Sequence, residues 1–158
     1  MTDKINIAVS VISRLTLGVV FIYAALDKIY DPYTFAADIR NYQIIPDGLS
    51  NLPAIILPWA ELICGVLLII GLHIRSTSIL IISMVAVFII AISLAMFRGL
   101  TIDCGCYHTL GDSTKIGYKK LAEDSVYLIM AIYLLISRKT GPALDKYILK
   151  SDPVQPDK

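Results

Sequence analysis

The chain has 158 residues, of which 56% are hydrophobic and 17% charged, with a mean hydropathy of +0.71 and a net charge of +1. Soluble domains carry roughly 25% charged residues, so this composition indicates a single domain in a lipid bilayer. The small net charge and the lack of a long basic run argue against nucleic acid as a partner, and three cysteines are too few for a secreted disulfide framework.

Four apolar segments approach the roughly 17 to 25 helical residues that cross a hydrocarbon core. Their expected bounds are residues 5–26, 52–72, 77–97 and 121–137. In lipid each must be a helix, because no other open element satisfies its own backbone hydrogen bonds. No small-residue cleavage site separates Met1 from the first segment, so we expect a retained first helix. The sequence predicts an all-α, four-helix transmembrane bundle over residues 1–140, followed by a polar tail over residues 141–158.

Arg14 and Glu61 lie near the middles of the first and second expected helices. An isolated charge at that depth costs at least about 2.5 to 3.5 kcal/mol, so we expect the two side chains to pair inside the bundle. Such a pair either fixes helix packing or handles protons or a ligand, which makes both residues candidates for a cofactor site. Close helix contacts are expected at small residues, namely Gly18, Ala24, Ala25, Gly65 and Gly71.

A short amphipathic helix is expected between the first two spans. Asp31 and Pro32 form a typical helix start, as cap and first helical residue. One face of this helix carries Phe35, Ile39 and Tyr42, and the opposite face carries Asp38, Arg40 and Asn41. The pattern predicts a helix on the membrane surface, either as an interfacial anchor or as a lid over the bundle.

Cys64 follows Glu61 by one turn in an apolar context, which favours a small core residue over a redox group. The fourth expected helix is the weakest span, because Glu123 and Asp124 lie near its start. We interpret Glu123 as a helix cap, whereas Asp124 either caps the helix or faces a polar cavity.

The candidate chemistry lies in the loop after the third helix, which reads Asp103-Cys104-Gly105-Cys106-Tyr107-His108. Two thiols one residue apart can close into a strained ring that is easily reduced and re-formed, which suits thiol-disulfide exchange. His108 could lower a thiol pKa or shuttle a proton. A metal site built from Cys104, Cys106 and His108 with Asp103 or Asp112, or an inert loop, remain the alternatives.

An even number of spans places both termini on one side of the membrane. Lys and Arg are divided almost evenly between the two sides, but the Arg138-Lys139 pair favours cytoplasmic termini. The cysteine loop would then face the periplasm from a bacterial inner membrane, where disulfides persist.

Many residues along the chain follow a known family pattern. They are Arg14, Leu17, Gly18, Phe21, Lys28, Asp31, Pro32, Phe35, Tyr42, Pro46, Pro58, Trp59, Glu61, Gly65, Gly71, Arg98, Gly99, Asp103, Cys104, Gly105 and Cys106. Through them the chain resembles the MauE/DoxX group of redox-associated membrane proteins. That resemblance implies a role in forming or maintaining disulfides beside a thioredoxin-like partner, and analogy with similar bundles suggests a quinone as cofactor.

The sequence therefore predicts a membrane thiol-disulfide redox protein whose Cys104 and Cys106 exchange electrons with an extracytoplasmic thioredoxin-like protein. The alternative is a non-enzymatic assembly factor or complex subunit, in which the Cys-Gly-Cys loop is a structural clip or a metal site.

Overall fold

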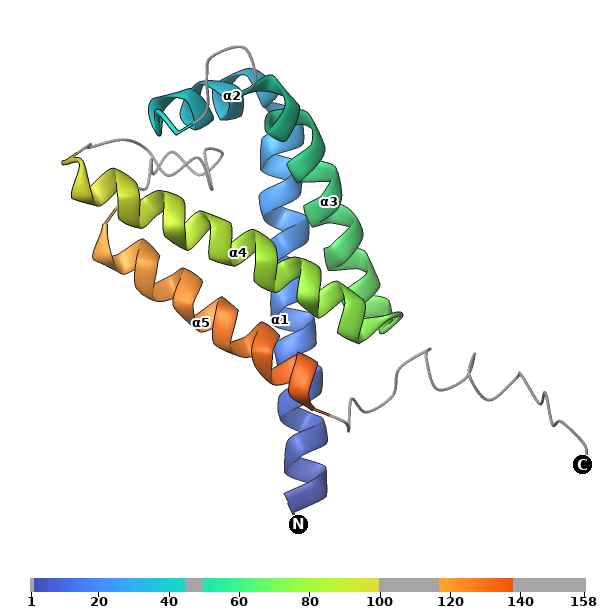
Figure 1. Cartoon of the computed structure of the whole chain (residues 1–158). Helices are drawn as coiled ribbons and strands as arrows, with labels where there is room; N and C mark the ends of the chain where they lie inside the picture. Colours follow the sequence, from blue (N-terminus) through green and yellow to red (C-terminus); the bar gives the residue numbers. More distant parts are fainter. Residues whose placement is uncertain (1, 45–49, 100–116, 138–158) are drawn as a thin grey trace, which may run out of the picture.

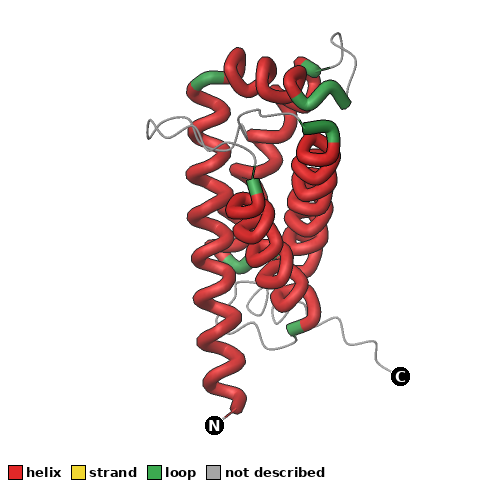
Figure 2. The backbone as a smooth tube through the Cα atoms, turned by 90° about the vertical axis from the view of Figure 1, so that its left-hand side faces the viewer, coloured by secondary structure: helices red, strands yellow, loops and turns green. Residues whose placement is uncertain are grey.

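The computed structural model describes residues 2–44, 50–99 and 117–137, which form five helices and no strand. In chain order they are α1 (Thr2–Tyr30), α2 (Pro32–Asn41), α3 (Asn51–Ile70), α4 (Ile74–Phe97) and α5 (Tyr118–Ile136). In Figure 1, α1 packs along α3, while α4 and α5 form a second pair that crosses α1. Figure 2 shows α2 lying across one end of these four helices. The all-α class predicted from the sequence is confirmed.

Three of the helices are long and apolar enough to cross a membrane. They cover Ile5–Tyr30, Asn51–Ile70 and Ile74–Phe97. Large apolar side chains on their outer faces, such as Ile12, Ile63 and Val87, are more than half exposed. Only a lipid solvent makes such surfaces favourable over the full length of a helix, so the chain is an integral membrane protein.

The fourth predicted span forms a helix, α5, but is not among these three. Its first two turns carry four charged residues, namely Lys119, Lys120, Glu123 and Asp124. Beyond them the outer face becomes apolar, with Val126, Ile129 and Ile136 exposed. The count of four spans therefore remains a prediction.

Helices α1 and α3 approach closely at two glycines. A Cβ atom on Gly18 would lie 3.0 Å from the carbonyl oxygen of Gly65, and a Cβ atom on Gly65 would lie 2.9 Å from that of Gly18. The Cβ atom on Gly18 would also lie 2.6 Å from the side chain of Ile69, and the one on Gly65 would lie 2.7 Å from that of Ile22. The later residue of α1 thus meets the earlier residue of α3, so the two helices run antiparallel. The predicted close contact at Gly18 and Gly65 is confirmed.

The amphipathic helix α2 begins as predicted. Asp31 accepts hydrogen bonds from the backbone nitrogen and hydroxyl of Thr34, at 3.1 and 2.6 Å, and Pro32 occupies the first turn. The predicted division of faces is wrong at one residue, because Asp38 is buried together with Phe35. Asp38 lies one turn after Phe35, on the side of α2 that packs against α3 and α1, so the same packing covers both residues.

Two helix bounds differ from the prediction in ways that matter for the site. Helix α1 continues to Tyr30, beyond the expected end at residue 26, and therefore includes Lys28. Helix α4 begins at Ile74 because Gly71 and His73, at φ values of 79° and 49°, complete the turn within three residues. The hairpin between α3 and α4 is thus tighter than the hydropathy indicates.

Candidate functional site

A buried ion pair joins the last turn of α1 to the middle of α3. Lys28 Nζ donates to both carboxylate oxygens of Glu61, at 2.6 and 2.7 Å, and the two residues are 4% and 5% exposed. The same ammonium lies 5.1 Å from the ring centroid of Phe35 on α2 and 5.3 Å from that of Phe88 on α4. An ammonium over an aromatic face is attracted by the ring quadrupole. One cation thus contacts three other helices.

The predicted pair between Arg14 and Glu61 is wrong, because both oxygens of Glu61 bind Lys28. The cause is the register of α1 against α3. Since Gly65 lies opposite Gly18 in antiparallel helices, Glu61 lies level with the residues near Ile22. Arg14 is buried about eight residues away along α1, which corresponds to roughly 12 Å.

A second charged group lies at the start of α5. Lys120 Nζ is 3.2 Å from Asp124 Oδ1 and 3.3 Å from Glu123 Oε2, and the Tyr127 hydroxyl donates to Glu123 Oε1 at 2.8 Å. Lys120 and Asp124 are buried. Glu123 is not a helix cap, because α5 begins at Tyr118 and places Glu123 in the second turn.

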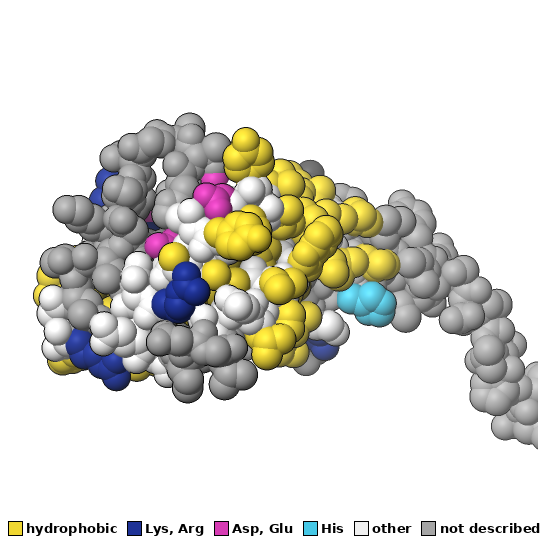
Figure 3. All heavy atoms as spheres, turned by 90° about the horizontal axis from the view of Figure 1, so that it is seen from above, with side chains coloured by type: hydrophobic (Ala, Val, Ile, Leu, Met, Phe, Trp, Pro, Cys, Tyr) yellow, Lys and Arg dark blue, Asp and Glu magenta, His cyan; other side chains and the backbone are white. Residues whose placement is uncertain are grey.

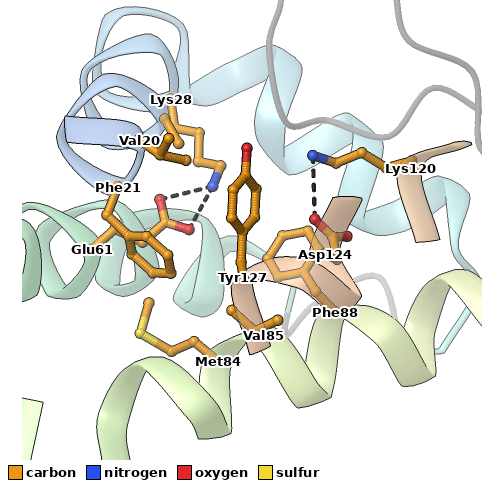
Figure 4. Close-up of a pocket in the computed structure, with 11 residues that line it drawn as sticks. Val20, Phe21, Lys28, Glu61, Met84, Val85, Phe88, Lys120, Asp124 and Tyr127 are labelled. Carbon is orange, nitrogen blue, oxygen red and sulfur yellow. Dashed lines mark hydrogen bonds and ion pairs between the residues drawn. The ribbon is translucent and has the colours of Figure 1, made fainter. Parts of the chain in front are cut away.

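The two charged groups face each other across a cavity of about 50 Å³, which we name the charged chamber. It is lined by Val20, Phe21, Ala24, Lys28, Glu61, Met84, Val85, Phe88, Lys120, Asp124 and Tyr127. In Figure 4, Lys28 and Glu61 approach from one side and Lys120 and Asp124 from the other, with the ring of Tyr127 between them. The cavity interpretation of Asp124 is thereby supported.

A larger groove of about 300 Å³ adjoins the chamber, between α2, α3 and α4. Its walls are mostly apolar and include Ile39, Leu57 and Val87, and it shares Met84 and Phe88 with the chamber. Those two side chains separate the apolar groove from the charged groups.

The cysteine loop lies outside the described residues, and with it Cys104, Cys106 and His108, as well as Asp103 and Asp112. The metal alternative involves these same residues, so nothing in the described part tests it. The other cysteine is described: Cys64 is a free thiol, 2% exposed, in the core cluster with Leu68 and Ile81. This position agrees with the predicted core role.

The described residues that flank the cysteine loop lie toward the α2 end of the bundle. Arg98, directly after α4, donates from Nη1 to the backbone oxygen of Gln43 at 3.1 Å, and Gly117 directly precedes α5. Figure 3 views this end and shows charged side chains gathered on one side and a broad hydrophobic area on the other. Of these flanking residues, Gly117 lies three residues before Lys120 of the charged chamber, whereas Arg98 lies ten residues beyond Phe88 and contacts Gln43 after α2.

Sequence reasoning missed Lys28, Lys120 and Tyr127 as site residues, although a signal was present. Lys28 follows Leu17 and Phe21 at helical spacing, on the buried face of α1. Lys120 precedes the buried residues Asp124, Ala131 and Leu134 on the core face of α5 in the same way. Extending each apolar stripe by one turn would have placed both lysines inside.

The family model for the methylamine utilisation protein MauE matches residues 6–137, which include all four residues of the two buried ion pairs. The chain belongs to the MauE family. The family resemblance seen in the sequence is therefore confirmed. No solved structure matches the chain.

Three relatives carry the same name, Methylamine utilization protein MauE. The MauE of Paracoccus versutus is 32% identical over 120 residues, covering 75% of this chain and 64% of the relative. That of Paracoccus denitrificans is 32% identical over 95 residues (60% and 51%), and that of Methylorubrum extorquens is 28% identical over 127 residues (80% and 68%). The chain thus spans between half and two thirds of the length of the two Paracoccus proteins.

Proposed function

We propose that this MauE-family chain is a membrane thiol-disulfide redox protein, in which Cys104 and Cys106 exchange electrons with an extracytoplasmic thioredoxin-like protein. The observation that supports the proposal is the sequence Cys104-Gly105-Cys106, in which two thiols one residue apart can close and reopen a disulfide. This sequence belongs to residues 100–116, which connect the end of α4 to the start of α5.

The chemistry requires two exchange steps. One thiolate of the reduced pair attacks the partner's disulfide, which forms a mixed disulfide and releases a partner thiolate. The second cysteine then attacks the first, which closes the Cys104 to Cys106 disulfide and releases the other partner thiolate. Two electrons pass to the partner, and the reverse sequence returns them. His108 would take up or return the proton of a thiol. A second thiol protein or a membrane quinone would complete the cycle.

The proposal includes a topology. Helix α5 is the fourth span, the termini are cytoplasmic, and the cysteine loop faces the periplasm from a bacterial inner membrane. An oxidising compartment keeps such a disulfide from being reduced by the cytosolic thiol pool.

A redox titration of the purified protein tests the proposal. The chain is equilibrated in glutathione buffers of graded ratio, the thiols are trapped, and the state of each cysteine is read by mass spectrometry. We expect Cys104 and Cys106 to change together in one two-electron transition, with a tenfold change in their ratio for about 30 mV. Cys64 serves as an internal control, because its burial in the apolar core predicts an unchanged thiol. Independent titration of Cys104 and Cys106 would contradict the proposal.

A second candidate function is a non-enzymatic accessory subunit, which the names of the relatives favour, since they are methylamine utilisation proteins. Here the surface helix α2 would bind a partner and the loop would serve as a clip. The double substitution Cys104→Ser and Cys106→Ser separates the two functions. A variant that supports growth as well as the native chain would favour the accessory role.

A further inference from the structure

One carboxylate oxygen of Asp124 lacks a hydrogen-bond partner among the described residues. Asp124 is 7% exposed, and its Oδ2 accepts no hydrogen bond from them, whereas Oδ1 pairs with Lys120 at 3.2 Å. Buried acceptors are normally satisfied, because a buried oxygen without a donor is unfavourable. The charged chamber that Asp124 lines therefore has a place for a hydrogen-bond donor from outside the described residues.

Lys28 sets a second requirement on that group. An ammonium has three N–H donors, and the described residues give Lys28 hydrogen-bond acceptors for two of them, both on Glu61. A hydroxyl group can accept from the third N–H and donate to Asp124 Oδ2 at the same time. The chamber volume of about 50 Å³ exceeds the ~10 to 15 Å³ that one water molecule needs, so a hydroxyl group fits.

The groove beside the chamber provides room for a hydrocarbon chain. It has a volume of about 300 Å³, and its mostly apolar walls include Leu57, Val87 and Ala91. Val87 is 65% exposed on the outer face of α4, a helix long and apolar enough to cross the membrane. The groove is thus continuous with the lipid-facing surface, and an apolar occupant enters it from the bilayer.

The polar residues of the groove already have interactions of their own. Among the described residues that line it, Asp38 and Tyr42 each interact with another residue, and the Ser83 hydroxyl donates to the backbone oxygen of Leu80 at 2.7 Å. A polar end group on the occupant therefore finds its acceptor at Asp124 Oδ2, on the chamber side.

Two side chains of α4, Met84 and Phe88, line both the groove and the chamber. In Figure 4 they extend from α4 toward the charged residues. The ring of Phe88 lies 5.3 Å from the Lys28 ammonium, an attraction that keeps the ring in place. Met84 is unbranched, has three rotatable bonds and adapts to the shape around it. The end of a narrow chain can therefore pass beside Met84 while Phe88 stays on Lys28.

We infer that the groove and the charged chamber together bind a membrane-soluble molecule that carries a hydroxyl group at one end of a hydrocarbon chain. The chain lies in the groove, and the hydroxyl group donates to Asp124 Oδ2 and accepts from Lys28. Long-chain alcohols and alkyl hydroquinones both have this chemistry. The site includes none of the cysteines, so it stands or falls independently of the proposed redox function.

Photolabelling in lipid nanodiscs tests the site with two probes. One is a long-chain alcohol that carries a photoreactive diazirine in its chain, and the other is the methyl ether of the same alcohol, which has no hydroxyl proton. Mass spectrometry reads the labelling of the peptides that contain Leu57 and Ala91 as a function of probe concentration. We expect the native chain to be half-labelled at an alcohol concentration about tenfold lower than that of the ether, the lower range for a hydrogen bond to a charged group.

Asp124→Asn should abolish this preference. The amide oxygen pairs with Lys120, and the amide nitrogen is a donor, so the hydroxyl proton has no acceptor and the two probes should label at equal concentrations. The matched control Asp27→Asn, one residue before Lys28 and outside the chamber lining, should keep the native ratio. Equal labelling of the native chain by alcohol and ether, as for a chamber that holds only water, would overturn the inference. A native ratio in Asp124→Asn would do the same.

A second pair of variants tests the groove. Val87 and Ile90 are 65% and 59% exposed on α4, but only Val87 lines the groove. Val87→Trp narrows the groove and should weaken labelling by both probes about tenfold, whereas Ile90→Trp adds similar bulk to the lipid-facing surface and should label like the native chain. Equal labelling of the two variants would place the chain outside the groove and contradict the inference.

Competition distinguishes the two sources of the hydroxyl group. Unlabelled hexadecanol and a decyl-substituted hydroquinone are each added with the photoreactive alcohol to the native chain. Stronger competition by hexadecanol assigns the site to a lipid alcohol, and stronger competition by the hydroquinone assigns it to a membrane hydroquinone. Failure of both compounds to reduce the labelling would overturn the inference.

Discussion

Halfway along α1, Gly18 packs against the backbone of α3, whereas near its end the same helix extends Lys28 to Glu61, Phe35 and Phe88. The first region is held by close contact between small residues, and the second by a charge that needs partners from other helices. The glycine contact fixes the register of α1 against α3, and the register decides which cation reaches Glu61. The two regions are therefore coupled, because backbone packing at the glycines determines that Lys28 is the cation that pairs with Glu61.

The largest effect is expected where a buried charge loses its partner. Glu61→Leu leaves Lys28 buried without its carboxylate and should reduce the free energy of unfolding by about 3 to 5 kcal/mol. The double variant Lys28→Met with Glu61→Leu removes both charges at similar volume and should recover most of that loss. Denaturant titration in detergent, followed by circular dichroism, measures both. A double variant as unstable as Glu61→Leu would contradict the pairing.

A smaller effect is expected at the glycine contact. Gly65→Ala places a methyl group 2.9 Å from the backbone oxygen of Gly18, which cannot move without shifting α1, so the variant should lose about 1 to 3 kcal/mol. If the register controls the ion pair, this variant should also weaken the coupling between Lys28 and Glu61.

That coupling is measured by repeating the Lys28→Met and Glu61→Leu double-mutant cycle in the Gly65→Ala background. An unchanged coupling energy would separate the two regions and contradict the view that backbone packing selects the pair.

The smallest effect is expected at α2, which lies across the end of the bundle and contacts Lys28 through Phe35. Asp31→Ala removes the side chain that accepts from Thr34 and should destabilise the start of the helix by about 0.5 to 2 kcal/mol. Asp31→Ser retains a capping oxygen and serves as the control. Hydrogen exchange of the α2 amides measures the change, and equal protection in the two variants would show that packing of Phe35, not the cap, holds α2.

The helices were predictable because their signals are local. Long apolar runs gave α1, α3 and α4, and Asp31 with Pro32 gave the start of α2. The partner of Glu61 was not predictable from depth counted along each segment, because it depends on how two helices are shifted against each other. Gly18 and Gly65 carried that information, but the sequence does not state which small residues meet.

Only part of the charged chamber could be predicted from the sequence. Asp124 could be assigned to a cavity because an acid inside an apolar helix needs a polar environment. Lys28 and Lys120 lie just outside the predicted spans at residues 5–26 and 121–137, because each stands at the edge of its apolar run. Their long aliphatic stems allow them to enter the bundle from that edge, which hydropathy does not register.

Thiol trapping in growing cells, with the states of Cys104 and Cys106 read by mass spectrometry, tests the proposed redox function most directly. We predict that the pair is a disulfide in one fraction of molecules and a dithiol in the other, and that added reductant shifts the balance while Cys64 stays a thiol. A pair that keeps a single state with and without reductant would contradict the redox function.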